Sequence, residues 1–73
     1  MIELIDKVIG QAISQGIIFN TITLDFWSYE KFIEELSNEY GQKLNKLTGY
    51  KEYKVNYEIK GVFGKQYFYI KLT

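Results

Sequence analysis

Residues 52–60 read EYKVNYEIK, and residues 65–72 read KQYFYIKL. In both stretches apolar or aromatic residues alternate with polar ones, which is typical of a strand with one buried face. The inward positions would be Tyr53, Val55, Tyr57 and Ile59 in the first stretch and Phe68, Ile70 and Leu72 in the second. Only the segment from Gly61 to Gly64 separates the two stretches, so the sequence predicts that they pair as a β-hairpin.

Three further elements precede this hairpin. Apolar residues recur at helical spacing over residues 2–15, and Gly16 is placed to end that helix in the left-handed conformation. Gly10 in its interior predicts close packing against another backbone. Residues 17–26 alternate as a strand, and residues 29–47 have the periodicity of a second helix.

The start of the second helix carries a clear capping pattern. Ser28 is a favoured N-cap residue, and Trp27 and Phe32 are spaced as a hydrophobic staple around it. Trp27 would then lie at the edge of the core, an interpretation that we prefer to a binding hot spot.

The chain therefore predicts one α+β domain over residues 1–73, in the order αβαββ. We expect both helices on one face of a three-stranded, mainly antiparallel sheet. The strand–helix–strand crossover should run the first two strands parallel. If the last strand inserts between them, the strand order is 1-3-2 and every neighbouring pair is antiparallel.

Composition excludes several kinds of function. The 73 residues include no Cys, His or Pro, and all nine cationic side chains are Lys. Without Cys and His the chain lacks the usual ligands of zinc, haem and iron–sulfur clusters, so we expect neither a metal nor a cofactor. The commonest catalytic bases and nucleophiles are also missing, so we do not expect an enzyme.

The chain has no run of about 20 apolar residues that would cross a membrane. Glu3 and Asp6 stand where a signal peptide needs positive charge, so we expect a cytoplasmic protein. The residue usage favours an AT-rich genome, and small proteins of this kind are typical of phages and mobile elements.

Charge is segregated along the chain although the formal net charge is zero. Residues 1–42 hold two Lys and seven acidic residues, whereas residues 43–73 hold seven Lys and two acidic residues. An acidic surface of one copy can meet a basic surface of another, so self-association as a homodimer is one expectation.

The outward face of the predicted hairpin is the candidate site. It would carry lysines, tyrosines and an asparagine, with Phe63 at the tip of the turn; the residues are Lys54, Asn56, Lys60, Phe63, Lys65, Tyr67, Tyr69 and Lys71. Three interpretations stay open for this face: a solvated surface, a protein-docking surface, and a surface where tyrosines stack bases and lysines follow phosphates.

We expect a small, non-enzymatic protein-interaction module, self-associating, that docks on a larger protein and inhibits it or assembles with it. The alternative is a single-stranded nucleic-acid-binding protein without sequence specificity that uses the same face. The absence of Arg removes the commonest specific contact to guanine, so such binding would be insensitive to sequence.

Overall fold

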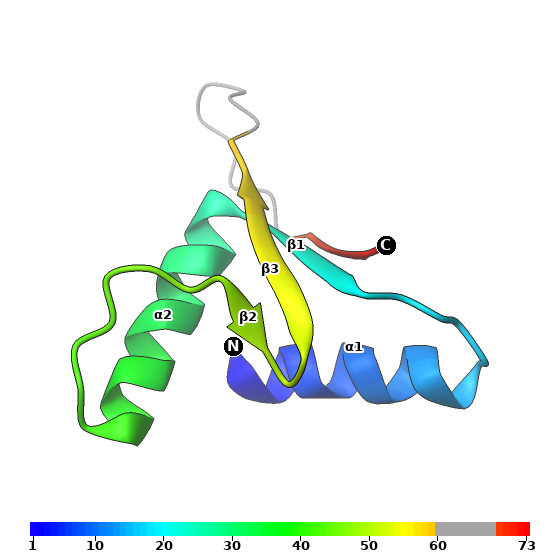
Figure 1. Cartoon of the computed structure of the whole chain (residues 1–73), viewed down its shortest axis with the longest axis horizontal. Helices are drawn as coiled ribbons and strands as arrows, with labels where there is room; N and C mark the ends of the chain where they lie inside the picture. Colours follow the sequence, from blue (N-terminus) through cyan, green and yellow to red (C-terminus); the bar gives the residue numbers. More distant parts are fainter. Residues whose placement is uncertain (60–68) are drawn as a thin grey trace.

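The computed structural model describes residues 1–59 and 69–73, and Figure 1 shows the helices and strands of these residues. In chain order they are α1 (Ile2–Ser14), β1 (Thr21–Asp25), α2 (Phe26–Tyr40), β2 (Gly49–Tyr50), β3 (Tyr53–Glu58) and β4 (Ile70–Leu72). The α+β class is confirmed: two helices pack against a mixed sheet of four strands.

The order of the sheet is β2-β3-β1-β4. β1 pairs in parallel with β3 on one side and antiparallel with β4 on the other, while β2 pairs antiparallel with β3. The expected order 1-3-2 is therefore wrong, and so is the hairpin, because β1 lies between β3 and β4. Alternation identifies the inward face of a strand, but it carries no information about the strand's neighbours. The most deeply buried strand takes the central place here: Ile22 and Leu24 of β1 are fully buried.

The strand β2 is an element that the sequence did not predict. α2 ends at Tyr40, with Gly41 at a φ of 68° as its left-handed cap, and not at residue 47. Gly49, which lies just beyond the predicted end of this helix, begins β2. A two-residue turn then joins β2 to β3, with Lys51 and Glu52 both at positive φ, as in a type I′ turn.

The start of α2 also differs from expectation. Asp25, the last residue of β1, is the N-cap, and its carboxylate accepts a hydrogen bond from the Ser28 backbone N–H at 3.2 Å. The Ser28 hydroxyl donates to the same carboxylate. The staple positions around this cap are filled by Leu24 and Tyr29, which are both buried in the core. Trp27 is left on the first turn of the helix, where 64% of its surface is exposed.

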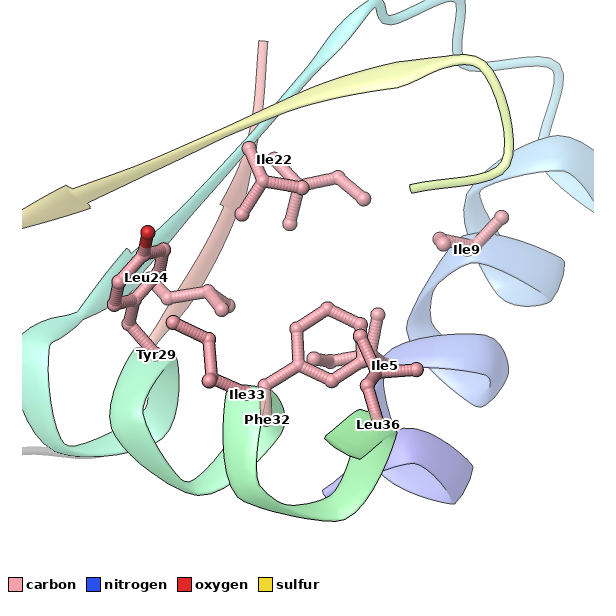
Figure 2. Packing of buried hydrophobic residues seen from close by; sticks show 9 residues of the cluster. Ile5, Ile9, Ile22, Leu24, Tyr29, Phe32, Ile33 and Leu36 are labelled. Carbon is pink, nitrogen blue, oxygen red and sulfur yellow. The ribbon is translucent and has the colours of Figure 1, made fainter. Parts of the chain in front are cut away.

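Both helices cover the same face of the sheet, as expected. Figure 2 shows side chains of α1, α2 and β1 meeting in one core, with Phe32 of α2 fully buried. The buried apolar cluster consists of Ile5, Ile9, Ile22, Leu24, Tyr29, Phe32, Ile33, Leu36 and Val55.

The end of α1 confirms the role expected of Gly16. With φ at 74°, the Gly16 N–H donates to the Ile13 carbonyl at 3.0 Å, and the Ile17 N–H donates to the Ala12 carbonyl at 2.9 Å. These two bonds form a Schellman motif. The expectation for Gly10 is wrong, because a Cβ built on it would meet nothing within 4 Å.

Gly10→Ala should stabilise the protein. Gly10 lies in the helix interior, so alanine should raise the free energy of unfolding by about 0.5–1 kcal/mol through a lower backbone entropy of the unfolded chain. For a domain of this size the midpoint of thermal unfolding should rise by about 4 °C. Gly16→Ala is the control and should lower the midpoint, because the positive φ strains alanine. A fall in the midpoint of Gly10→Ala would show that Gly10 is needed in the fold.

Asp25→Ala should destabilise the protein more than Ser28→Ala. The first change removes the helix cap and should lower the free energy of unfolding by about 1–3 kcal/mol. The second removes one hydroxyl and leaves the cap in place, so it should cost about 1 kcal/mol. Urea unfolding followed by circular dichroism measures both. The reverse ranking would restore Ser28 as the N-cap.

Candidate functional site

The structure describes half of the predicted site. Lys54 and Asn56 lie on β3, Lys71 lies on β4, and Tyr69 directly precedes β4. The other four predicted residues lie outside the described residues; they are Lys60, Phe63, Lys65 and Tyr67.

The strand register brings the described members onto the face of the sheet opposite the helices. Thr23 of β1 is the partner of both Asn56 and Lys71, and Thr21 is the partner of Lys54. Paired residues on adjacent strands share a face, so Asn56, Thr23 and Lys71 form one row across three strands. Lys54, Asn56 and Lys71 are exposed. The described members therefore share one face of the sheet, with β1 between their strands.

Tyr69 makes a contact that the sequence did not indicate. Its hydroxyl donates a hydrogen bond to the Glu58 carboxylate on β3. Since β1 separates the two strands, the Tyr69 side chain must lie across β1. The hydrogen bond to Glu58 is the main reason why the pKa of Tyr69 rises to about 12. The phenol therefore stays protonated, and remains a hydrogen-bond donor, to a higher pH than an ordinary tyrosine.

Carboxylates accompany the lysines on this face. Glu58 is the register partner of Asp25, and the Asp25 carboxylate also accepts the Tyr69 backbone N–H at 3.2 Å. Among the described residues, Lys54 and Lys71 are therefore matched by two acidic side chains. This part of the face offers hydrogen-bonding groups but little net attraction for phosphate.

A groove along α2 is a second candidate, which the sequence pattern did not indicate. It has a volume of about 640 Å³ and lies between one side of α2 and the segment after the helix. Its apolar lining comes from Phe26, Trp27, Ile33 and Leu44, and its polar lining from Glu30, Lys31, Glu34, Ser37, Asn38 and Lys43. The wall after the helix is fixed by Ser37, whose hydroxyl donates to the Ile33 carbonyl at 2.8 Å and accepts the Leu44 N–H at 3.0 Å.

Phe26 and Trp27 distinguish this groove from an ordinary helix surface. Phe26 is 40% exposed and Trp27 is 64% exposed, although both are large apolar side chains. Phe26 also contacts Tyr57 of β3 edge-on, with 5.4 Å between ring centroids. The sequence does contain one indication of this groove, which is Asp25. Asp25 is as good an N-cap residue as Ser28, and a helix that begins after Asp25 has Trp27 in its first turn.

Two further polar networks fasten α1 to the rest of the fold. The Asp6 carboxylate accepts hydrogen bonds from the Tyr50 hydroxyl at 2.7 Å and from Lys51 Nζ at 3.1 Å. Burial acts to raise the pKa of Asp6, but these hydrogen bonds outweigh it and lower the pKa. Burial, followed by the bond to Asp6, raises the pKa of Tyr50. This network fixes the β2–β3 turn against α1.

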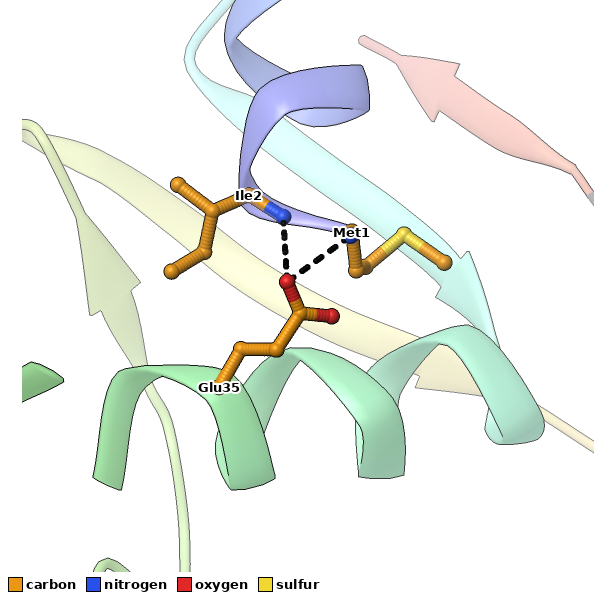
Figure 3. A network of polar contacts seen from close by, with 3 residues as sticks. All are labelled: Met1, Ile2 and Glu35. Carbon is orange, nitrogen blue, oxygen red and sulfur yellow. Dashed lines mark hydrogen bonds and ion pairs between the residues drawn. The ribbon is translucent and has the colours of Figure 1, made fainter. Parts of the chain in front are cut away.

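The second network joins the two helices (Figure 3). The N-terminal ammonium of Met1 lies 2.9 Å from Glu35 Oε1, and the Ile2 N–H donates to the same oxygen at 3.3 Å. The hydrogen bond from the ammonium is the main cause that lowers the pKa of Glu35. These perturbed groups are all engaged in contacts within the fold.

In the described part of the chain, no cluster of three or more acidic, His or Cys side chains could hold a metal ion. Neither α1 nor α2, the helices of that part, is long and apolar enough to cross a membrane. Comparison with protein-family models, curated proteins and solved structures found no match.

Glu35→Gln should reduce the pH dependence of stability. Folding lowers the pKa of Glu35, so its ion pair stabilises the folded state fully when the pH is above the ordinary pKa of 4.5. This stabilisation is lost as the pH falls through the lowered pKa of the folded state. The variant should unfold at a lower temperature than the wild type near neutral pH, and the gap should narrow as the pH falls to about 3.

Thermal unfolding at a series of pH values measures that gap. Glu34→Gln is the matched control, because Glu34 is exposed on the same helix and forms no ion pair with another described residue. A gap between wild type and Glu35→Gln that does not change with pH would contradict the assigned ion pair.

Proposed function

We propose that the protein is a small binding module that acts without catalysis and docks on a larger protein through the groove along α2. The observation that carries this proposal is the exposure of Trp27 beside Phe26 at the groove. Tryptophan is enriched among the residues that dominate binding energy at protein interfaces.

The chemistry of the groove supports a protein as the ligand. Apolar side chains are accompanied by acidic and basic ones, among them Glu30, Glu34, Lys31 and Lys43. An apolar centre with a charged rim is the usual composition of a protein interface. A standard interface needs about 800 Å² from each partner, which a chain with 5530 Å² of surface can supply.

The absence of catalysis is part of the proposal. The chain contains neither His nor Cys. The described groups with shifted pKa values bind one another or the N-terminus: Tyr50 binds Asp6, Tyr69 binds Glu58, and Glu35 binds Met1. Docking alone is enough to inhibit a target protein when it covers the active site or binding site of that protein.

The outer face of the sheet supports a second candidate, the binding of single-stranded nucleic acid. Exposure of Lys54, Asn56 and Lys71 on one face favours it, while Glu58 and Asp25 on the same face oppose phosphate. A labelled oligonucleotide titrated across a salt series tests this candidate through the release of counterions.

Trp27→Ala should weaken partner binding at least about 30-fold while leaving the fold intact. Loss of a central tryptophan typically weakens an interface by about 2 kcal/mol or more, a factor of about 30 in Kd. Affinity capture with wild-type protein identifies the partner, and titration of the purified partner against each variant gives the Kd. Trp27 is the only tryptophan of the chain, so its fluorescence also reports the contact directly when the partner lacks tryptophan.

Ile18→Ala is the matched control, because Ile18 is 98% exposed and takes no part in the groove. The control should bind as the wild type does. Equal binding by the wild type and Trp27→Ala would contradict the proposed site. The same titrations with light scattering show whether the protein itself is a monomer of 8.7 kDa or twice that mass.

A further inference from the structure

One edge of the sheet is only partly covered by the residues that the structure describes. β2 pairs with β3 at Tyr53 and Lys54, and the Val55 N–H donates to the Thr48 carbonyl at 3.1 Å. On the opposite side of β3, the Lys54 N–H donates to the Asn20 carbonyl at 2.8 Å, in line with the parallel pairing to β1. Alternate residues of a strand direct their backbone groups to opposite sides. The odd-numbered residues of β3 therefore direct theirs away from β1.

Tyr57 is the first odd-numbered residue beyond the cover provided by β2 and Thr48. Its N–H and carbonyl point away from β1, and no described residue supplies them with a backbone partner. The residue remains 45% exposed, although the centroid of its ring lies 4.6 Å from that of Tyr29. A strand edge in this state is a template for a further strand.

The neighbouring loop is held away from this edge. The Tyr29 hydroxyl donates to the Leu47 carbonyl at 3.1 Å and accepts the Leu47 N–H at 3.0 Å. A cavity of about 700 Å³ remains beside β3, lined by Tyr29, Leu47, Thr48 and Val55 to Glu58, together with Lys46 and Lys54. The cavity therefore continues the line of β2 along the open part of β3.

The charges at this edge favour an acidic ligand. Lys46 and Lys54 are exposed and form no ion pair with another described residue. Among the described residues of the lining, the one carboxylate is that of Glu58, which accepts the Tyr69 hydroxyl.

We propose that the open edge of β3 binds an extended, acidic segment of a partner protein, which adds to the sheet in line with β2 through the backbone of Tyr57. Such a segment has two faces. Its apolar side chains lie on the side of the Tyr29 and Tyr57 rings, and its acidic side chains lie on the side of Lys54. Main-chain hydrogen bonds then supply affinity, and the alternating side chains supply specificity.

A second copy of the chain fits this edge poorly. If β3 of two copies paired about Tyr57, Ile59 of one copy would lie opposite Val55 of the other. The Val55 N–H already donates to Thr48, which occupies that position. A segment of another protein does not meet this obstacle, because it can end before Thr48.

This inference goes beyond the proposed function, since it concerns backbone groups of β3 and not the groove that contains Trp27. The two are tested by different variants. Trp27→Ala should leave edge binding unchanged, and Tyr57→Pro should remove it. Failure of one variant to act therefore does not decide the other proposal.

The probe is a short blocked peptide in which valine alternates with glutamate, and the matched control peptide carries lysine in place of glutamate. With ¹⁵N-labelled protein, hydrogen exchange of the Tyr57 amide should slow at least about tenfold on addition of the glutamate peptide. By fluorescence anisotropy, the lysine peptide should bind at least about tenfold more weakly.

Two substitutions at one position separate the backbone from the ring. Tyr57→Ala removes the ring and keeps the N–H, so its Kd for the glutamate peptide should stay within about tenfold of the wild-type value. Tyr57→Pro also removes the N–H and should abolish binding. Proline is tolerated where the N–H faces away from the ladder, and circular dichroism checks that the fold is kept.

Several results would overturn the proposal. One is a hydrogen-exchange rate of the Tyr57 amide that does not change at saturating peptide, and another is equal affinity for the glutamate and lysine peptides. A third is loss of peptide binding in Trp27→Ala. The fourth is a wild-type dimer that is absent in Tyr57→Pro. If Tyr57→Pro does not fold, the exchange of the Tyr57 amide in the wild type decides the question alone.

Discussion

The carboxylate of Asp25 holds together the corner on which the arrangement of the fold depends. It stands where β1 ends and α2 begins, and only 8% of the residue is exposed. One of its oxygens caps α2 through the Ser28 N–H, and the other accepts the Ser28 hydroxyl and the Tyr69 N–H. A single side chain thus fixes the direction of α2 and holds the residue preceding β4 against the end of β1. The exposure of Trp27 follows from the same cap, because a helix that begins at Phe26 places Trp27 on its first turn, outside the core.

Local patterns in the sequence predict local structure well and strand neighbours poorly. The periodicity of α1 and the Gly16 cap depend on residues close in sequence, and both are found in the structure. The alternation predicted over residues 52–60 is found only in the first part of β3, where Val55 is buried between exposed Lys54 and Asn56. The inward positions predicted for Tyr57 and Ile59 are wrong in burial, because Tyr57 is 45% exposed and Ile59 is 75% exposed. The position of β1 between β3 and β4 depends on which strand buries most apolar surface when it has a neighbour on both sides. Ile22 and Leu24 are fully buried, so β1 is that strand. A strand of five residues does not show in its sequence that it will be central.

The errors at the ends of α2 have a different physical origin. Asp25 and Ser28 are both good N-cap residues, so the choice between them depends on where β1 ends. At the other end, Leu44 and Leu47 continue the helical spacing, yet they pack against the core from a loop. Gly41 ends the helix first because its backbone is left-handed. β2 has two residues and a turn without glycine, so it lacks both the periodicity and the turn residues that predict a hairpin.

The two surfaces proposed for binding share one structural cause, which is the path of residues 41–48. Leu44 walls the groove along α2, and Thr48 ends the cover over β3. The hydrogen bonds to Ser37 and Tyr29 hold this path in place, so both surfaces exist before a ligand arrives. Rigid surfaces of this kind lose little conformational entropy on binding.

The aromatic rings connect these surfaces. Tyr57 contacts both Phe26, which lines the groove, and Tyr29, which lines the cavity at the strand edge. A strand that a partner adds at Tyr57 therefore lies close to Phe26, which lines the groove beside Trp27. One partner large enough to bury about 800 Å², roughly a seventh of the 5530 Å² surface, would be able to occupy both. In that case its strand would be oriented by backbone hydrogen bonds, and its affinity would come mainly from the side chain that covers Trp27.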